Sequence, residues 1–196
     1  MKKILICTFT IALTTGCAPL IVQSPSEGYR PVNVKDLPGA SRLMLDGHDV
    51  VAYFTESKHR LGTDKFQSIY KGVNFFFASA ENKALFDKTP TQYLPQYGGY
   101  CANGVVYGIP WGGDADTWRI VNGKLYIFGG IGSKKAFELD LPANITLADK
   151  YWADEINGSN AFVQRSKRMV MKVPHYKSGE ALAAMVAAKE GAPKAP

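Results

Sequence analysis

Short hydrophobic runs in the first half of the chain predict β-strands. Residues 50–54 are β-branched and aromatic, and this run predicts a buried strand. Residues 66–70 and 73–77 are two further runs of this kind, and the Lys71-Gly72 pair between them is a turn signal. The two runs therefore predict a β-hairpin.

A second hairpin follows from the strongest local pattern in the sequence. Residues 117–121 and 124–128 are apolar runs separated by Asn122-Gly123. Asn-Gly suits a two-residue type I′ turn, because both central residues of that turn take a positive φ. We expect these runs to pair as antiparallel strands.

A short helix is predicted directly after the first hairpin. Ser79 is a suitable N-cap for a helix over residues 80–87, and Pro90 ends it. Leu85 and Phe86 are expected to face the sheet.

The C-terminal third has a helical pattern. Its predicted elements are short helices capped by Ser133 and Thr146, a helix or strand at 164–172, a helix at 178–190 and a disordered end at 191–196. Together with the hairpins, these elements predict an α+β fold in which a small antiparallel sheet carries short helices and a C-terminal helical extension.

Composition excludes several classes of protein. The chain has 196 residues, and its hydrophobic fraction of 46% is too high for a disordered protein. Its 3 cysteines cannot build a disulfide-rich mini-protein. The 23 Lys and Arg against 17 Asp and Glu give a formal charge of +6, which is a first hint of an acidic partner.

The N-terminus has the features of an export signal. Lys2 and Lys3 precede a charge-free and mostly apolar run at residues 4–13, which is shorter than the ~20 residues that a membrane-spanning helix needs. The segment around Gly16-Cys17 resembles a bacterial lipobox, although Thr14 stands where that motif usually has Leu. The resemblance implies that Cys17 carries acyl chains such as palmitate and anchors the protein in a membrane. The alternative is an ordinary signal peptide in which Cys17 is incidental.

These features suggest four segments. We expect a signal peptide at 1–16, a Pro-rich tether at 17–40, a folded domain at 41–155 and an extension at 156–196. Cleavage removes two lysines and no acid, so the formal charge falls from +6 to +4. Much of the remaining excess lies in the C-terminal part. It suits a surface near anionic lipid or another envelope protein better than nucleic acid.

Three stretches of the chain resemble one family. Residues 46–54, 73–86 and 93–102 look like those of YHS-domain proteins of the secreted, stand-alone branch, and the similarity extends over about residues 44–155. The resemblance implies a small α+β unit that binds a metal, with copper as the first candidate. Domains of this family occur in copper-transporting ATPases, in some hydroxylases and in exported proteins.

The chain departs from this family at its metal-binding motif. The metal-binding branch tends to show Phe-Cys-Ser-x-x-Cys, where this chain has residues 77–82. Ala78 and Asn82 replace the two cysteines, only Ser79 remains, and the histidine of the family name falls near Tyr70. The usual thiolate ligands are therefore missing.

One candidate site surrounds His48. Asp46 and Asp49 flank this histidine, so it could bind a metal while an acid orients its second nitrogen. The alternative is that Asp46-Gly47 is turn chemistry, in which the aspartate bonds the backbone and Gly47 adopts a positive φ.

The second candidate is Cys101. Gly98-Gly99 allows the backbone to approach another group closely, and Tyr100 precedes the thiol. A thiolate with an imidazole suits copper or zinc, and a thiolate could also act as a nucleophile or redox group. The alternative is a small buried core residue.

The sequence therefore predicts an exported, lipid-anchored YHS-family protein that binds copper or zinc without established catalysis. Cys101 and His48 are the expected ligands, and Asp46, Asp49 and Tyr100 have supporting roles. Two alternatives stay open: a thiol-based enzyme or redox protein that uses Cys101, and a structural or interaction module of the cell envelope. The expected location is the periplasmic face of the outer membrane in a Gram-negative cell. The expected partners are the membrane and a metal ion, with an envelope protein as a further candidate.

Overall fold

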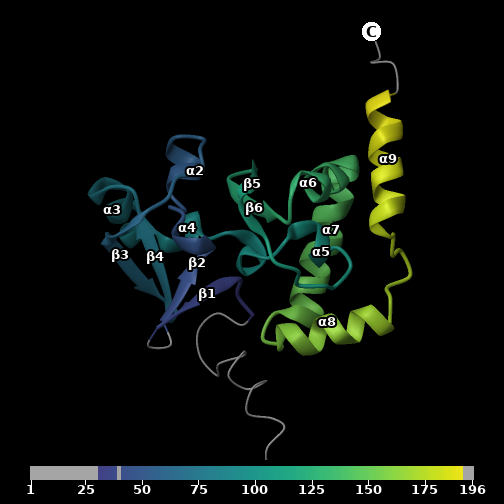
Figure 1. Ribbon diagram of the computed structural model, residues 1–196, viewed down its shortest axis with the longest axis horizontal. Coiled ribbons are helices and arrows are strands. Elements are labelled where there is room, and N and C mark those ends of the chain that lie inside the picture. Colours follow the sequence, from purple (N-terminus) through teal and green to yellow (C-terminus); the bar gives the residue numbers. More distant parts are fainter. Residues whose placement is uncertain (1–30, 39–40, 192–196) are drawn as a thin grey trace, which may run out of the picture.

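The computed structural model describes residues 31–38 and 41–191, and in this part of the chain the strands form two sheets (Figure 1). The four-stranded sheet contains β1 (Val34–Leu37), β2 (Ser41–Met44), β3 (Thr63–Tyr70) and β4 (Val73–Phe77), in the order β1-β2-β4-β3. The pair β2–β4 is parallel and the other two pairs are antiparallel. The α+β prediction is confirmed, with one parallel pairing that was not expected.

The first hairpin and its helix are confirmed. Strands β3 and β4 pair across Lys71 and Gly72, whose φ values of 48° and 71° are those of a tight turn. Helix α3 (Ala80–Lys88) follows, and the Ser79 hydroxyl accepts a hydrogen bond from the Asn82 N–H. Phe86 is buried as expected, whereas Leu85 is exposed.

The prediction of a strand at residues 50–54 is wrong. This segment enters helix α2 (Ala52–Thr55) after a turn, although Val50 and Tyr53 are fully buried. The Asp49 carboxylate accepts hydrogen bonds from the N–H groups of Val51 and Ala52, which starts a helical turn. The hydrophobic run predicted burial correctly, but a nearby polar residue decided the backbone conformation.

The folded region begins before residue 41. Strand β1 lies within the segment that was predicted to be a tether, and it pairs with β2. The Asn33 amide donates to the carbonyls of Gly99 and Gly113. A Cβ atom on Gly98 would lie 2.8 Å from the carbonyl oxygen of Pro31, so the glycine is needed for this close approach. The predicted signal peptide, Cys17 and the first part of the tether lie outside the described residues.

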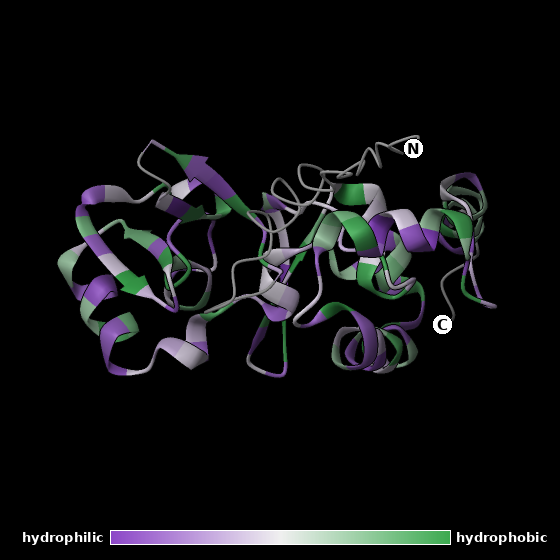
Figure 2. Ribbon diagram, turned by 90° about the horizontal axis from the view of Figure 1, so that it is seen from below, coloured by the Kyte–Doolittle hydropathy of each residue, from purple (hydrophilic) through white to green (hydrophobic). Residues whose placement is uncertain are grey.

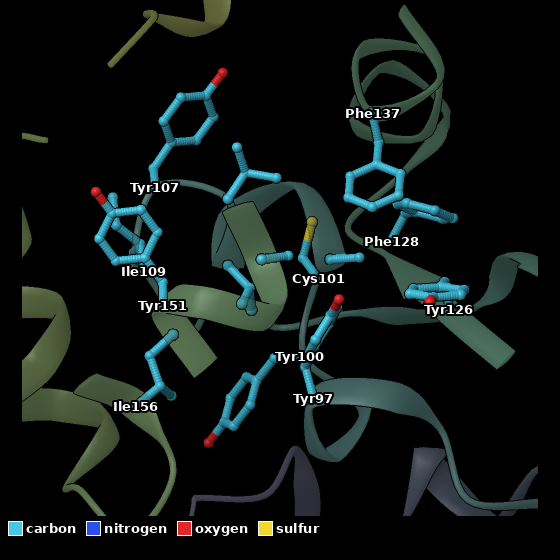
Figure 3. Close-up of a cluster of buried hydrophobic side chains, with 14 of the residues drawn as sticks. Tyr97, Tyr100, Cys101, Tyr107, Ile109, Tyr126, Phe128, Phe137, Tyr151 and Ile156 are labelled. Carbon is cyan, nitrogen blue, oxygen red and sulfur yellow. The ribbon is translucent and has the colours of Figure 1, made fainter. Parts of the chain in front are cut away.

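The second hairpin is confirmed and lies at the centre of the molecule. Strands β5 (Asp114–Val121) and β6 (Lys124–Phe128) join through Asn122 and Gly123, with φ values of 50° and 72°. All four residues after Lys124 in β6 are buried, and they alternate between two hydrophobic clusters. Leu125 and Ile127 join the cluster beneath the four-stranded sheet, while Tyr126 and Phe128 join the cluster that contains Cys101 (Figure 3). Strand β6 is therefore a wall shared by both clusters.

Helices form the C-terminal part of the molecule. They are α6 (Ile131–Phe137), η3 (Glu138–Asp140), α7 (Leu141–Tyr151), η4 (Trp152–Ile156), α8 (Ala161–Val170) and α9 (Gly179–Gly191). Figure 2 shows hydrophobic positions in both the sheet region and this helical region. Among the described helices, none is long and apolar enough to cross a membrane.

Two helix starts differ from the prediction. Ser133 lies inside α6, and Thr146 lies inside α7. The N-cap of α7 is Asp140, whose carboxylate accepts from the Ala143 N–H, and the Thr146 hydroxyl instead donates to the carbonyl of Pro142 one turn earlier. The helix predicted at 178–190 is confirmed by α9, segment 164–172 is helical up to Val170, and residues 192–196 lie outside the described part.

Candidate functional site

His48 lines a cavity of about 620 Å³. We call it the histidine pocket. It lies where β1, the 3-10 turn η1 (Leu45–Gly47), the loop before β3 and the start of β5 meet. The polar residues that line it are Asn33, Lys35, Asp46, His48, His59, Asp114 and Asp116.

His48 is held by the turn that precedes it. Its Nδ1 lies 2.9 Å from the Leu45 carbonyl oxygen, which can only accept, so Nδ1 carries the proton and donates. Within the described residues Nε2 has no hydrogen-bond partner, and its lone pair is available. The exposed ring of His59 lies beside it, with 6.1 Å between the ring centroids. A histidine whose second nitrogen is fixed by a carbonyl is a common arrangement at metal sites.

Carboxylates give the histidine pocket a negative balance. Asp114 and Asp116 are exposed at the start of β5, and both line the pocket. Asp46 is exposed in η1 and lies 3.7 Å from the ammonium of Lys35, which is the cation that lines the pocket. The pocket therefore attracts cations.

Asp49 does not face this pocket. The residue is fully buried, and its two carboxylate oxygens accept four hydrogen bonds at 2.7–3.2 Å. Oδ1 accepts from the N–H groups of Val51 and Ala52, and Oδ2 accepts from the Ala78 N–H and the Asn82 side-chain amide. With both oxygens satisfied by protein donors, Asp49 joins the loop after η1 to the end of β4 and the start of α3.

This network occupies the place of the family's missing motif. Ala78 and Asn82 stand where the metal-binding branch tends to have cysteines, and both donate to Asp49. No thiol lies at these positions, and the carboxylate there is saturated by N–H donors. These residues therefore do not fit a thiolate metal centre.

Cys101 lies in a different part of the molecule. The side chain is 3% exposed and packs in the cluster of Tyr97, Tyr126 and Phe128 (Figure 3). Its backbone N–H donates to the Trp111 carbonyl. These surroundings are those of a small core residue.

Tyr100 also belongs to this second cluster. Its hydroxyl donates to the carbonyl of Val32 at 3.1 Å and so fastens the N-terminal segment. Burial raises the pKa of Tyr100 to about 12, against a smaller opposing effect of Arg165. Its position supports a packing role.

The predicted site residues are thus brought together only in part. His48 and Asp46 share the histidine pocket, and Cys101 and Tyr100 share the second cluster. Cys101 and His48 line separate cavities. In the described ranges no group of three or more His, Cys, Asp or Glu side chains could hold a metal ion.

The sequence did not point to three lining residues of the histidine pocket. His59 lies in a polar segment with no local sign of a site, and the bridge between His48 and Leu61 brings that loop alongside η1. Asp114 and Asp116 lie before the predicted second hairpin, and the pairing of β5 with β6 brings them to the pocket.

Comparison with family models gives one match. Residues 51–97, from just before α2 into the 3-10 turn η2 (Gln96–Gly99), match the family described as YHS domain. The matched segment contains the β3–β4 hairpin and α3. Comparisons with curated proteins and with solved structures give no match. The YHS domain is associated with metal binding, and residues 51–97 of this chain are similar to it.

Proposed function

We propose that the protein is an exported, lipid-anchored YHS-domain protein that binds a transition metal ion, copper or zinc, in the histidine pocket. The observation that carries this proposal is His48, whose Nδ1 is fixed on the Leu45 carbonyl and whose Nε2 is unpartnered beside His59. Imidazole nitrogen suits both metals. The three carboxylates of the pocket supply a negative field around the ion.

The proposed site is open rather than closed. Two imidazoles fall short of the four protein ligands of a structural zinc site, so water or a partner's side chain would complete the coordination. His59 is exposed, and a rotation of its side chain brings a second nitrogen to the same ion. Such a site suits capture and release of a metal. Cys101 is outside this proposal because it lines another cavity.

Metal binding is tested with the full chain by calorimetry with Zn²⁺ and Cu²⁺ and by metal analysis after loading. His48→Ala and His59→Ala are each expected to weaken binding about 10-fold or more, since each removes one of two protein ligands. His175→Gln changes a histidine outside the pocket and is expected to leave binding unchanged. Binding that survives both pocket substitutions removes this site, and an absence of binding for both metals removes the function.

The proposal of a lipid anchor is based on the sequence around Cys17. Cys17→Ala is expected to move the protein from the membrane fraction to the soluble fraction. A protein that remains membrane-bound after this change is not anchored through Cys17.

A further inference from the structure

Two adjoining cavities lie between the core and the C-terminal extension. The first, of about 480 Å³, lies between Tyr107, Trp111 and Tyr176, and we call it the head cavity. The second, of about 500 Å³, lies between α6 and α9, and we call it the tail cavity. Asn103, Ser133 and Leu182 are among the residues that line both, so the cavities share a wall. Neither shares a lining residue with the histidine pocket.

Asn103 offers an unpaired amide to both cavities. The residue is 8% exposed and lines both cavities, yet its side-chain amide has no hydrogen-bond partner among the described residues. The amide reaches the cavities that it lines, so a polar group bound there can pair with it. This amide is placed to donate to a polar group that enters the head cavity.

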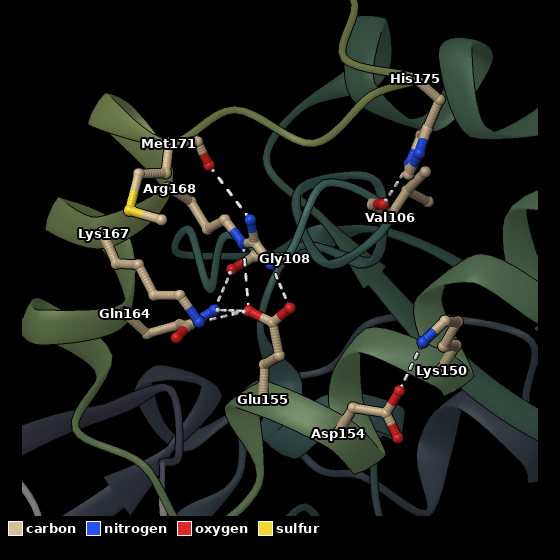
Figure 4. Close-up of polar contacts among 10 residues, drawn as sticks. All are labelled: Val106, Gly108, Lys150, Asp154, Glu155, Gln164, Lys167, Arg168, Met171 and His175. Carbon is tan, nitrogen blue, oxygen red and sulfur yellow. Dashed lines mark hydrogen bonds and ion pairs between the residues drawn. The ribbon is translucent and has the colours of Figure 1, made fainter.

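The charge of the head cavity selects an anion. Its charged lining residues are Arg168, Lys172 and Lys177, and no acidic residue of the described chain lines it. Arg168 is committed to Glu155 (Figure 4). Lys172 and Lys177 form no ion pair in the described part of the chain, and the Lys172 ammonium lies 4.6 Å from the centroid of the Tyr176 ring. Two lysines and a free amide suit a carboxylate.

The tail cavity is mostly apolar, with Glu190 as the charged residue among the described residues that line it. Small and aliphatic residues of α6 and α9 line most of it, among them Ala136, Ala183, Val186 and Ala187. Helix α9 runs alongside α6 (Figure 1), where Lys135 pairs with Glu190 at 2.8 Å. The Lys189 ammonium also donates to the carbonyls of Glu138 and Leu139. A groove walled by such small side chains accommodates an unbranched alkyl chain.

We propose that the head and tail cavities together form a binding site for a single-chain fatty carboxylate. The carboxylate lies in the head cavity near Asn103, Lys172 and Lys177, and the alkyl chain extends under α9. Half of this site comes from the extension after residue 156, which lies outside the segment matched to the YHS family. The proposal is independent of metal binding at His48.

The test uses the full chain and the fluorescence of cis-parinaric acid, with hexadecanoate as the competitor. Hexadecanoate is expected to displace the probe, whereas hexadecylamine, with the opposite charge, is expected to displace it at least 10-fold less well. A binding assay with phosphatidylglycerol vesicles distinguishes binding of a free fatty acid from binding to a lipid surface. Equal displacement by the amine, or binding to vesicles without binding of the probe, overturns the proposal.

Variants locate the site. Leu182→Trp fills the junction of the cavities and is expected to abolish probe binding, while Leu61→Trp, at an exposed leucine, is expected to have no effect. The exposed pair Lys172→Gln/Lys177→Gln is expected to weaken binding about 10-fold. The pair Lys58→Gln/Lys88→Gln removes the same charge elsewhere and serves as its control.

Asn103→Leu removes the amide at nearly constant volume and is expected to weaken binding several-fold. Thermal unfolding of each variant identifies any that fail to fold. If a buried substitution prevents folding, the exposed Lys172→Gln/Lys177→Gln variant still tests the proposal. Unchanged probe affinity in a folded Leu182→Trp or in the Lys172→Gln/Lys177→Gln variant contradicts the proposal.

Discussion

At the scale of single residues, Asp49 shows how environment decides the role of a carboxylate. Asp46 and Asp49 lie three residues apart, and the sequence assigned both to the support of His48. Asp46 is exposed beside Lys35, whereas Asp49 is fully buried and accepts four hydrogen bonds. A buried charge is stable only when it is this well satisfied, so Asp49 serves the fold.

Asp49→Asn is expected to lower the free energy of unfolding by about 2 kcal/mol. The substitution keeps the shape of the side chain but turns an NH₂ group toward N–H donors that lose their acceptor. Urea unfolding measures the loss, and Asp36→Asn, at an exposed aspartate of β1, is the control. A loss no larger than that of the control would show that the network contributes little.

At the scale of elements, the two hairpins were predictable because their turns carry local signals. Asn122-Gly123 takes the two positive φ values that a type I′ turn requires. The helix α2 was not predictable from its own residues, because the acceptor that starts it is the side chain of Asp49. The parallel pairing of β2 with β4 joins segments far apart in sequence, and no local pattern encodes it.

Two glycine substitutions are expected to change stability in opposite directions. Gly123→Ala meets open space, but its φ of 72° strains an L-residue, so we expect a loss of about 1 kcal/mol. Gly132 also faces open space, but it lies inside α6, where alanine favours the helix by up to about 1 kcal/mol. Thermal unfolding compares both variants with the wild type. A destabilised Gly132→Ala would mean that its surroundings, rather than the backbone, decide the sign.

At the scale of the whole molecule, the extension is fastened to the core by polar contacts. Glu155 of η4 bonds Gln164, Lys167 and Arg168 of α8 (Figure 4). Gln164 also donates to the Gly108 carbonyl, and His175 bonds the Val106 carbonyl. Several basic residues of the C-terminal part are thus used within the molecule, so only part of the charge excess remains for an anionic partner.

Glu155 makes the docking of the extension dependent on pH. Burial disfavours its ionised form, but hydrogen bonds from Gln164, Lys167 and Arg168 outweigh burial and lower its pKa from 4.5 to about 2. Because the folded pKa is the lower one, the stabilisation is present above about pH 4.5 and is lost as the pH falls toward 2.

Glu155→Gln is expected to cost about 1 kcal/mol at pH 6, discounted for partial solvent exposure, and to cost little near pH 2. Denaturant unfolding at both pH values measures this difference. Glu180→Gln, at an exposed acid of α9, is the control. A cost that does not change with pH would show that the charge of Glu155 is not what stabilises the docked extension.

The sequence by itself determined the two hairpins, α3 and α9, because turns and helix caps are local patterns. It also determined the likeness to the YHS family and the two candidate site residues, His48 and Cys101, because family motifs are local patterns too. Only the tertiary structure decided that His48 lies beside His59 while Cys101 lies in another cluster. It also decided that Asn103 faces a cavity formed with the extension. The bridge between His48 and Leu61 places His59, and the packing of distant segments against the two faces of β6 places Cys101, so no local pattern encodes either position.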